Sequence, residues 1–371
     1  MHQEIAAIPD GGVAVVLGTR PEIIKLAGVI AELGPKACVI HTGQHYDTGL
    51  SDVFFTERGL PAPRVRFAVG GAGRGGQIGA GLTSLDEWFA RHRPVAVVVQ
   101  GDTNATVTGA LAANARRIPV VHVEAGLRSF DKTMPEEYNR IITDHLSDLL
   151  CAATEGNVEN LAREGIGGAA VIRTGNTVVE AVRAQLPGRH RRRALLARRG
   201  LVPGGYALVT VHRPENTDDA AALRTILTEL HRLPCPVVLP LHPRTLGAVR
   251  RHGLVDLLDG LGVTGPLGSA EFLGLAAHAA FLVSDSGGVQ EECTVLKRPL
   301  IVVRRSTERP EAMQDFAVLV SPGPLISKTA AEWWRDLPGL HRRLAALESP
   351  FGAGDASRRI VAEIARRFGT R

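Results

Sequence analysis

One stretch of the chain, residues 95–140, restricts the possible fold more than any other. It begins with five consecutive apolar residues, Val95–Val99, which lie between a proline and a glycine. A continuous apolar run of this length favours a strand that is buried on both faces of a parallel sheet. The alanine-rich segment Thr103–Asn114 predicts a helix, and Ile118–Val123 predicts a second buried strand. The three segments therefore predict a βαβ unit, in which the ligand-binding loops follow the carboxyl ends of the strands.

Three acidic residues, Asp102, Glu124 and Glu136, stand at or just beyond those strand ends. Converging carboxylates repel one another, so proteins bring them together mainly where protons or cations are handled. A structural interpretation is also open, in which Asp102 caps a helix and Glu136, with Glu137, simply begins one. The occurrence of three acids at successive loop positions favours the chemical interpretation.

The first strand, predicted over Val13–Leu17, runs directly into the sequence GTRPEIIK. The glycine permits a tight turn, and the proline and glutamate suit the first turn of a helix. Arg20 and Lys25 flank the start of this helix, where exposed backbone N–H groups already favour an anion. The pattern predicts an anion-binding turn, although an ordinary turn with a surface arginine would look the same.

The length of 371 residues is too great for one ordinary hydrophobic core and predicts two domains. The longest apolar runs are strand-length, and the first residues lack the basic start and long apolar core of a signal peptide. Four scattered cysteines without a CxxC pair indicate reduced thiols and argue against a zinc site. We therefore expect a cytoplasmic protein with no membrane segment and no metal.

The net charge of +5 and the pI of about 9.3 raise the question of nucleic acid binding. The basic residues are concentrated locally, as in Arg189–Arg193, and aromatic residues make up only 4% of the chain. Without aromatic side chains to stack on bases, a solvated basic surface is the better interpretation. The excess of positive charge also suits an anionic nucleotide substrate.

The second half of the chain repeats the alternation and places His212 and His242 at the ends of two predicted strands. Arg213 follows the first histidine directly, and Arg244 follows the second after one proline. A single histidine more often has a structural role. Two of them at homologous strand ends favour contact with a ligand.

A further predicted strand, Phe281–Ser284, leads into the sequence DSGGVQEEC. Ser286 and the two glycines after it would let backbone N–H groups approach phosphate oxygens, with the helix dipole adding attraction. One turn into the helix, Glu292 can accept hydrogen bonds from ribose hydroxyls. Arg309, in RRSTERPEA, can pair with a diphosphate or support Glu292.

Several of these segments are similar to one enzyme family. QGDTNAT, HVEAGLRSFD and MPEEYNRIITDHLSDLL resemble the signature segments of the non-hydrolysing UDP-N-acetylglucosamine 2-epimerases, and GTRPEIIK resembles the family's first segment. The resemblance implies two Rossmann-like α/β domains facing across a cleft, an arrangement called glycosyltransferase-B-like. It implies that residues 1–185, with the final helix 356–371 packing back on them, carry the acids, and that residues 186–355 bind UDP. It also implies a homodimer that needs no cofactor, metal or nicotinamide.

The resemblance assigns roles to residues at matching positions. The implied catalytic residues are Asp102, Glu124, Glu136 and His212. The implied UDP-binding residues are Arg20, Lys25, His212, Phe272 (against uracil), Ser286, Gly287, Gly288, Glu292 and Arg309. A possible second site, where family members bind UDP-N-acetylglucosamine as an activator, includes Gln44, Arg213 and His242.

The implied reaction inverts C2 of the sugar. UDP leaves C1 as the C2 proton is removed, which gives 2-acetamidoglucal, and re-addition with protonation on the other face gives UDP-N-acetylmannosamine. The reaction requires a base, an acid and stabilisation of the diphosphate. The sequence leaves open which of the three acids handles which proton.

Alternative functions also remain open. One is a hydrolysing 2-epimerase that releases UDP and N-acetylmannosamine, and another is a 2-epimerase of a different UDP-sugar, such as a diacetamido uronate. A glycosyltransferase of the same architecture and a non-catalytic sugar-nucleotide-binding regulator are both disfavoured by the three acids. A dinucleotide enzyme is disfavoured because no GxGxxG follows the first strand.

The chain departs from the family pattern at four positions. Asp47 stands where a second glutamine is often found and Gly76 where many members have an arginine, which leaves regulation by substrate open. Arg305 replaces an acid, and Phe316 stands where a glycine is expected. The glycine-rich residues 69–82 predict a mobile loop that closes over a ligand.

Overall fold

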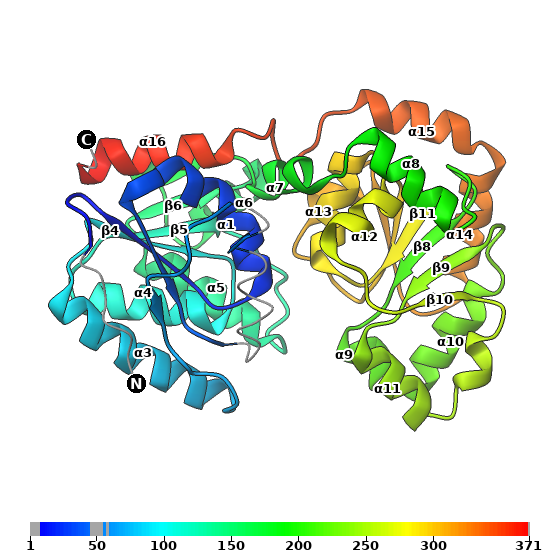
Figure 1. The fold of residues 1–371 in the computed structure, drawn as a ribbon, viewed down its shortest axis with the longest axis horizontal. Coiled ribbons are helices and arrows are strands. Elements are labelled where there is room, and N and C mark those ends of the chain that lie inside the picture. Colours follow the sequence, from blue (N-terminus) through cyan, green and yellow to red (C-terminus); the bar gives the residue numbers. More distant parts are fainter. Residues whose placement is uncertain (1–7, 45–54, 57–58, 370–371) are drawn as a thin grey trace. The chain divides into compact units, whose positions relative to one another are not determined.

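Two compact units make up the chain, and each contains its own parallel β-sheet (Figure 1). The computed structural model describes residues 8–44, 55–56 and 59–369. The first unit comprises residues 1–181 and 351–371, and the second comprises residues 182–350. The predicted fold class, α/β with two Rossmann-like domains, is confirmed.

The sheet of the first unit has the strand order β3-β2-β1-β4-β5-β6-β7, and all its pairings are parallel. Its strands are β1 (Val13–Leu17), β2 (Ala37–His41), β3 (Val65–Arg66), β4 (Ala96–Gln100), β5 (Val120–Ala125), β6 (Leu149–Ala152) and β7 (Val171–Arg173). Its helices are α1 (Arg20–Leu33), α3 (Arg74–Arg91), α4 (Asn104–Ala115), α5 (Pro135–Leu146), α6 (Glu155–Arg163), α7 (Val178–Gln185, which runs into the second unit) and α16 (Ala356–Phe368), with 3-10 turns at Gly34–Lys36 and Gly168–Ala170. The predicted βαβ unit is confirmed as β4-α4-β5, with both strands shifted slightly toward the carboxyl end.

The sheet of the second unit has the order β10-β9-β8-β11-β12-β13, again with parallel pairings. Its strands are β8 (Ala207–Thr210), β9 (Val237–Pro240), β10 (Gly262–Thr264), β11 (Phe281–Ser284), β12 (Leu300–Val303) and β13 (Ala317–Val320). Its helices are α8 (Arg189–Arg198), α9 (Pro214–Thr217), α10 (Ala220–Leu230), α11 (Pro243–Arg251), α12 (Ser269–Ala276), α13 (Gly287–Leu296), α14 (Leu325–Arg335) and α15 (Leu337–Ala346), with 3-10 turns at Val255–Leu258 and Pro310–Met313. Among the described residues, no helix combines the length and apolarity needed to cross a bilayer.

Each sheet has one point at which the order of strands reverses. In the first unit the reversal lies between β1 and β4, and in the second unit it lies between β8 and β11. Open parallel sheets bind ligands outside the carboxyl ends of their strands at such a switch point. The turns after β1 and β4, and those after β8 and β11, are therefore the first places to look for a site.

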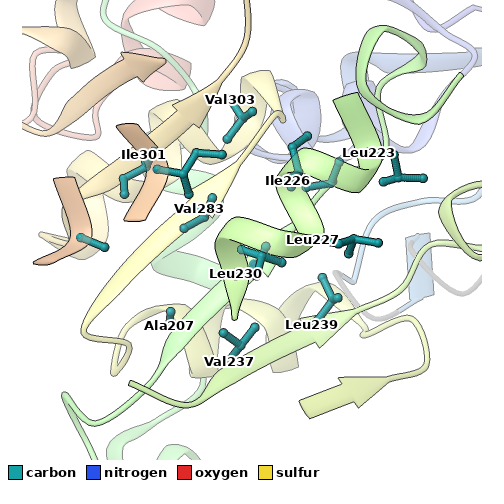
Figure 2. Close-up of a cluster of buried hydrophobic side chains, with 14 of the residues drawn as sticks. Ala207, Leu223, Ile226, Leu227, Leu230, Val237, Leu239, Val283, Ile301 and Val303 are labelled. Atoms are coloured by element: carbon teal, nitrogen blue, oxygen red, sulfur yellow. The ribbon is translucent and has the colours of Figure 1, made fainter. Parts of the chain in front are cut away.

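The continuous apolar strands are explained by helices on both faces of each sheet. In β1, Val13, Val15 and Leu17 face a core that includes residues of α1 and α16, whereas Ala14 and Val16 face a core with residues of α3 and α4. All five residues of β1 are 0% exposed. In the second unit, Leu223, Ile226, Leu227 and Leu230 of α10 join Ala207, Val237, Leu239, Val283, Ile301 and Val303 of the sheet in one cluster (Figure 2).

The glycine-rich segment 69–82 is only partly a loop. The prediction of a mobile loop is wrong from Arg74 onward, because α3 begins there. Each glycine inside a helix costs about 1 kcal/mol relative to alanine. In α3 this cost is offset by burial of Leu85, Trp88 and Phe89 in the core. At Gly81 the glycine also allows α4 to come close, because an added Cβ would lie 3.1 Å from the Thr108 side chain.

The last helix, α16, packs against α1 with unusually close contact at Gly28. Ile360 and Ile364 of α16 join the core beneath α1, and the Ser357 N–H donates to Glu180 Oε1 at 2.9 Å. A Cβ at Gly28 would lie 2.8 Å from Glu180 Oε2 and would overlap the Ser357 hydroxyl. This position therefore needs glycine for space rather than for its backbone freedom.

Gly28→Ala is expected to lower the free energy of unfolding by about 1–3 kcal/mol, because the added methyl group overpacks the contact between α1 and α16. Gly79→Ala in α3 is the matched control, because no atom lies within 4 Å of its added Cβ. That control should gain about 0.4–1 kcal/mol, since alanine restricts the unfolded chain and favours the helix. Urea unfolding of both variants tests the pair, and equal effects of the two substitutions would contradict the proposed crowding.

Candidate active site

Glu124 lies at the end of β5, where the pairing with β6 is irregular. The register shifts between Val123 and Ala125, and Glu124 has a φ of 67°. A left-handed conformation is uncommon for a residue with a Cβ and often marks a functional site. A bulge re-aims the side chain it contains. Here the re-aimed residue is an acid that is only 3% exposed.

The Glu124 carboxylate accepts hydrogen bonds from three separate parts of the first unit. Lys25 Nζ of α1 lies 2.5 Å from Oε1, and the Asn176 side-chain amide, after β7, donates to the same oxygen at 2.8 Å. The side-chain amide of Gln100, the last residue of β4, donates to Oε2. These contacts stabilise the ionised form. Glu124 is thus a fixed anion at the carboxyl edge of the sheet.

Asp102 follows β4 and pairs with a buried arginine of α5. Arg140 Nη2 lies 2.5 Å from Asp102 Oδ2, and Arg140 Nη1 lies 2.6 Å from Glu137 Oε2. The Asn139 side-chain amide also donates to the Asp102 carbonyl at 2.8 Å. The Asp102 side chain is 31% exposed. It is therefore fixed in position and still accessible to a ligand.

Glu136 and Glu137 are neighbours at the start of α5 but have opposite environments. Glu137 is 2% exposed and accepts from the backbone N–H groups of Ser129 and Phe130, so it shapes the loop before the helix. Glu136 is exposed and precedes Arg140 by one helical turn, which places the two on the same side of α5. Glu136 is thus the member of this pair that a ligand can reach, and Arg140 connects its part of α5 to Asp102.

Glu22, in the first turn of α1, bridges the switch point of the first sheet. Its Oε2 accepts from the N–H groups of Gly18 and Thr19, and its Oε1 accepts from the Thr103 hydroxyl at 2.8 Å. The carboxyl group therefore joins the turn after β1, which carries Arg20, to the turn after β4. Burial raises the pKa of Glu22 to about 7, although its hydrogen-bond donors act in the opposite direction.

The raised pKa of Glu22 predicts that stability depends on pH. Between the ordinary pKa of 4.5 and the folded value of about 7, the folded chain holds a proton that the unfolded chain has released. The contribution of Glu22 to stability is thus present below the ordinary pKa and is lost as pH rises through the folded pKa, by at most about 3 kcal/mol. Glu22→Gln should remove this dependence. Urea unfolding of both proteins at either side of the window tests it, and a pH-independent difference between them would contradict it.

In the second unit, a buried aspartate orients His212 at the switch point. Asp285, directly after β11, is 0% exposed and accepts from the backbone N–H groups of His212 and Arg213 at 2.9 Å. His212 Nδ1 lies 3.1 Å from Asp285 Oδ1. Burial acts to raise the pKa of Asp285, but the bonds from His212, Arg213 and Asn216 outweigh it and hold the pKa below its ordinary value. Nδ1 of His212 is therefore the donor, and the ring's outer nitrogen is left for a ligand.

His242 stands beside His212 at the same edge of the sheet. The two ring centroids are 6.1 Å apart. His242 Nδ1 accepts from the Arg244 N–H at 3.2 Å and so caps α11. Partial burial, His212 and Arg244 together lower the pKa of His242. The neutral ring that results can accept a hydrogen bond, so both the structural and the ligand-binding interpretation of this residue stand.

The turn after β11 brings Arg309 close to the start of α13. Ser286 is the N-cap of α13, and a Cβ at Gly287 would lie 2.8 Å from Arg309 Nη1. Arg309 Nε in turn lies 2.7 Å from the buried Glu291, and Nη1 contacts Glu308. Gly288 faces open space, with only Ser286 Oγ near its would-be Cβ. The arginine is thus held against the helix start by acids on two sides.

The remaining predicted residues lie in varied settings. Phe272 of α12 is half-buried, and Arg20 and Arg305 are exposed. Gln44 Oε1 accepts from the Ala105 N–H at 3.0 Å, close to the start of α4. Glu292 is half-buried in α13.

Three of the departures from the family pattern have different outcomes. Phe316 is 2% exposed directly before β13, with Lys297 Nζ 5.2 Å from its ring centroid, so a large residue fits where a glycine was expected. Asp47 lies outside the described residues. Gly76 is inside α3, and the neighbouring Gln77 accepts from the Asn104 amide at 2.8 Å.

Sequence reasoning missed several residues that hold the acids in place. They are Gln100 and Asn176 on Glu124, Arg140 on Asp102, Glu137 on Arg140, Glu22 at the first switch point, and Asp285 on His212. All of these residues except Asn176 stand inside the segments GTRPEIIK, QGDTNAT, MPEEYNRIITDHLSDLL and DSGGVQEEC that were singled out above. The signal that could have found them is a polar residue next to an acid at a strand end.

In the described part of the chain, no three His, Cys, Asp or Glu side chains come together as a group that could hold a metal ion.

Comparisons with known proteins agree over most of the chain. Residues 32–365 match a protein family described as UDP-N-acetylglucosamine 2-epimerase. The chain is 37% identical over 360 residues to the UDP-N-acetylglucosamine 2-epimerase of Methanocaldococcus jannaschii, covering 94% of this chain and 97% of that one. It is 33% identical over 378 residues to the UDP-2,3-diacetamido-2,3-dideoxy-D-glucuronate 2-epimerase of Pseudomonas aeruginosa, covering 95% and 99%. A crystal structure of the Methanocaldococcus jannaschii UDP-GlcNAc 2-epimerase in complex with UDP-GlcNAc and UDP superposes with a TM-score of 0.84 at 36% identity, covering 96% and 99%.

Proposed function

Because the chain belongs to the UDP-N-acetylglucosamine 2-epimerase family, we propose that it interconverts UDP-N-acetylglucosamine and UDP-N-acetylmannosamine by eliminating and re-adding UDP. The relatives and the solved complex support UDP-N-acetylglucosamine 2-epimerase activity and a UDP-sugar as the small-molecule partner. The non-hydrolysing course of the reaction is the finer part of the proposal. We further propose that the enzyme acts as a cytoplasmic homodimer.

The observation that carries the proposal is the set of acids at one edge of the first sheet. Glu124 is a buried carboxylate on Lys25, Asp102 is a partly exposed carboxylate on Arg140, and Glu136 is exposed near the same arginine. A site that only binds a sugar has no need of a strained, buried anion. A reaction that removes and returns a proton needs a base and an acid held in place.

In the proposed reaction, a carboxylate of this set takes the proton from C2 of the sugar. The electrons of the C2–H bond form a C1=C2 double bond, and the C1–O bond breaks so that UDP leaves with its electron pair. A carboxylic acid of the set then protonates C2 from the opposite face, and the UDP oxygen re-forms its bond to C1. No atom is gained or lost overall. We assign the two proton transfers to Asp102, Glu124 and Glu136 as a set.

The departing UDP needs positive charge and hydrogen-bond donors. We propose that His212, oriented by Asp285, together with Arg20, supplies them to the diphosphate. Ser286–Gly288, at the start of α13, would present backbone N–H groups, with Arg309, Glu292 and Phe272 completing the nucleotide site. These assignments rest on the family resemblance and on the position of each residue at a strand's carboxyl end.

Incubation of the purified protein with UDP-N-acetylglucosamine, followed by NMR, tests the proposed function. The expected product is UDP-N-acetylmannosamine with the nucleotide still attached. Stoichiometric release of free UDP and N-acetylmannosamine would assign the chain to the hydrolysing class instead. Absence of any turnover of this substrate, with UDP still bound, would favour a sugar-nucleotide-binding regulator.

A second candidate substrate is supported by one relative. The chain is nearly as similar to the Pseudomonas aeruginosa 2-epimerase, which is named for a diacetamido uronate, as it is to the Methanocaldococcus jannaschii protein. Direct comparison of kcat/KM for the two UDP-sugars decides between them. A higher value for the diacetamido uronate would replace UDP-N-acetylglucosamine in the proposal and leave the chemistry at C2 unchanged.

A further inference from the structure

A buried network of charged side chains joins the three segments that carry the acids. His122 of β5 has its Nδ1 2.6 Å from Asp144 Oδ1 of α5 and its Nε2 2.9 Å from the Gly101 carbonyl oxygen. Both the His122 and the Asp144 side chains are 0% exposed. Neither residue has a part in the reaction proposed above. A pair of ionisable groups this deeply buried needs a reason.

Asp144 is the centre of the network. Asp144 also faces Arg128 Nη2 at 2.8 Å and accepts from the Gly126 N–H at 3.1 Å. Burial acts to raise the pKa of Asp144, but His122 and Arg128 outweigh it and hold the pKa below its ordinary value. Nδ1 of His122 thus faces a carboxylate oxygen and Nε2 faces a carbonyl oxygen, so each side of the ring is held by a separate segment.

A second carboxylate, Glu164 of the loop after α6, extends the network beyond Arg128. Arg128 makes a two-bond contact with Glu164, with Nε and Nη2 at 2.7 and 2.6 Å from its two carboxylate oxygens. Arg128 thus lies between two carboxylates, those of Asp144 and Glu164. A buried charge that is paired and hydrogen-bonded in this way holds one defined geometry.

That geometry coincides with the positions of the acids. Asp144 binds His122 and Gly126, which stand two residues before and two residues after Glu124, so its two oxygens bracket the bulge. His122 then extends the hold to Gly101, directly before Asp102. Asp144 itself belongs to α5, the helix whose first turn contains Glu136. One histidine and one aspartate thus connect all three acid-bearing segments.

We propose that His122 and Asp144 are positioning residues, which fix the turn before Asp102 and the bulge at Glu124 relative to α5. The expected kinetic effect rests on the proposed function, whereas the positioning of the two segments rests on the contacts alone. A displacement of about 1 Å at a reacting group can cost about 10²-fold in rate without any loss of binding. Loosening this pair should therefore lower kcat and leave KM nearly constant.

Asp144→Asn tests the proposal, with Asp86→Asn as the matched control. Asp86 pairs with Arg116 through two contacts in the same unit, but both side chains are more than one-third exposed and lie between α3 and α4. We expect Asp144→Asn to lower kcat by about 10- to 100-fold with KM changed by less than about threefold, and Asp86→Asn to change neither. A folded Asp144→Asn protein with the kcat of the control, or with kcat unchanged and KM raised, would overturn the proposal.

NMR gives a readout that does not depend on turnover. In ¹⁵N-histidine-labelled wild-type protein, the His122 ring should show a hydrogen-bonded Nδ1–H proton, identified by its loss in His122→Gln, because Asp144 Oδ1 lies 2.6 Å from Nδ1. A ring whose Nδ1 carries no hydrogen-bonded proton would overturn the contact and the proposal with it. This measurement uses the wild-type fold, so it also decides the matter if Asp144→Asn does not fold.

The same spectra separate failure of the inference from failure of the proposed function. If the wild-type protein turns over no UDP-sugar, the proposed function fails. The positional claim is then decided by the backbone amide signals of Asp102 and Ala125. They should shift in Asp144→Asn and stay in place in Asp86→Asn, and unchanged signals in both variants would refute the positioning role.

Discussion

Glu124→Gln is expected to lower kcat by about 10³-fold while leaving the affinity for UDP almost unchanged. The substitution removes the anion that Lys25 faces at 2.5 Å and turns an amide group toward the donors Gln100 and Asn176. It therefore removes both the proton-transfer capacity of the group and its fixed orientation. UDP affinity should persist because the proposed nucleotide-binding residues lie mainly in the second unit.

Steady-state kinetics and calorimetric titration with UDP measure the two quantities. Glu155→Gln is the control, because Glu155 is another glutamate of the first unit whose side chain is 66% exposed in a pair with Arg173. The control should keep wild-type kcat. Thermal unfolding shows whether Glu124→Gln is still folded. A folded Glu124→Gln enzyme whose kcat is within fivefold of the control would remove Glu124 from the catalytic set. A fivefold difference corresponds to about 1 kcal/mol of activation free energy.

Asp285→Asn is expected to lower kcat by about 10²-fold and to weaken UDP binding about tenfold. Asp285 accepts from two backbone N–H groups and from the ring of His212, so an amide group there must turn a donor toward a donor. The His212 ring then loses the partner that fixes its outer nitrogen toward a ligand.

A double-mutant cycle with His212→Asn separates orientation from a general loss of structure. If Asp285 acts through His212, adding Asp285→Asn to His212→Asn should cost little more than His212→Asn alone. Additive losses of kcat would show that Asp285 acts independently and would contradict the orienting role. Asp219→Asn at the start of α10, which caps a helix in the same unit, is the control. It should leave both stability and kinetics close to the wild-type values, because asparagine caps a helix about as well as aspartate.

The sheet architecture could be predicted from the sequence because the central strands are buried on both faces. The run Val95–Val99 and the strand Val13–Leu17 contain only apolar residues, and the structure places helices over both of their faces. Asp102, Glu124 and His212 were predicted at strand ends for the same reason, since the carboxyl edge of a parallel sheet gathers such residues. Local pattern was sufficient at these positions.

The detailed geometry of the site depends on contacts between distant residues, which local pattern does not contain. The left-handed backbone of Glu124 is stabilised by partners at positions 25, 100 and 176, and by Asp144 around it. Local propensity disfavours that conformation, so sequence reasoning has no basis for predicting it. The helix Arg74–Arg91 was not predicted because it too depends on contacts between distant residues. Its packing on α4 outweighs the glycine content of its first turns.

The measurement that tests the central claim most directly is the reaction of UDP-N-acetylglucosamine in D2O, followed by NMR. If a carboxylate of the first unit removes the C2 proton, UDP-N-acetylmannosamine should form with deuterium at C2 and with UDP attached. The Glu124→Gln enzyme should show both exchange and product formation slowed together. Formation of UDP-N-acetylmannosamine that retains the original hydrogen at C2 would contradict proton transfer by these acids and with it the central claim.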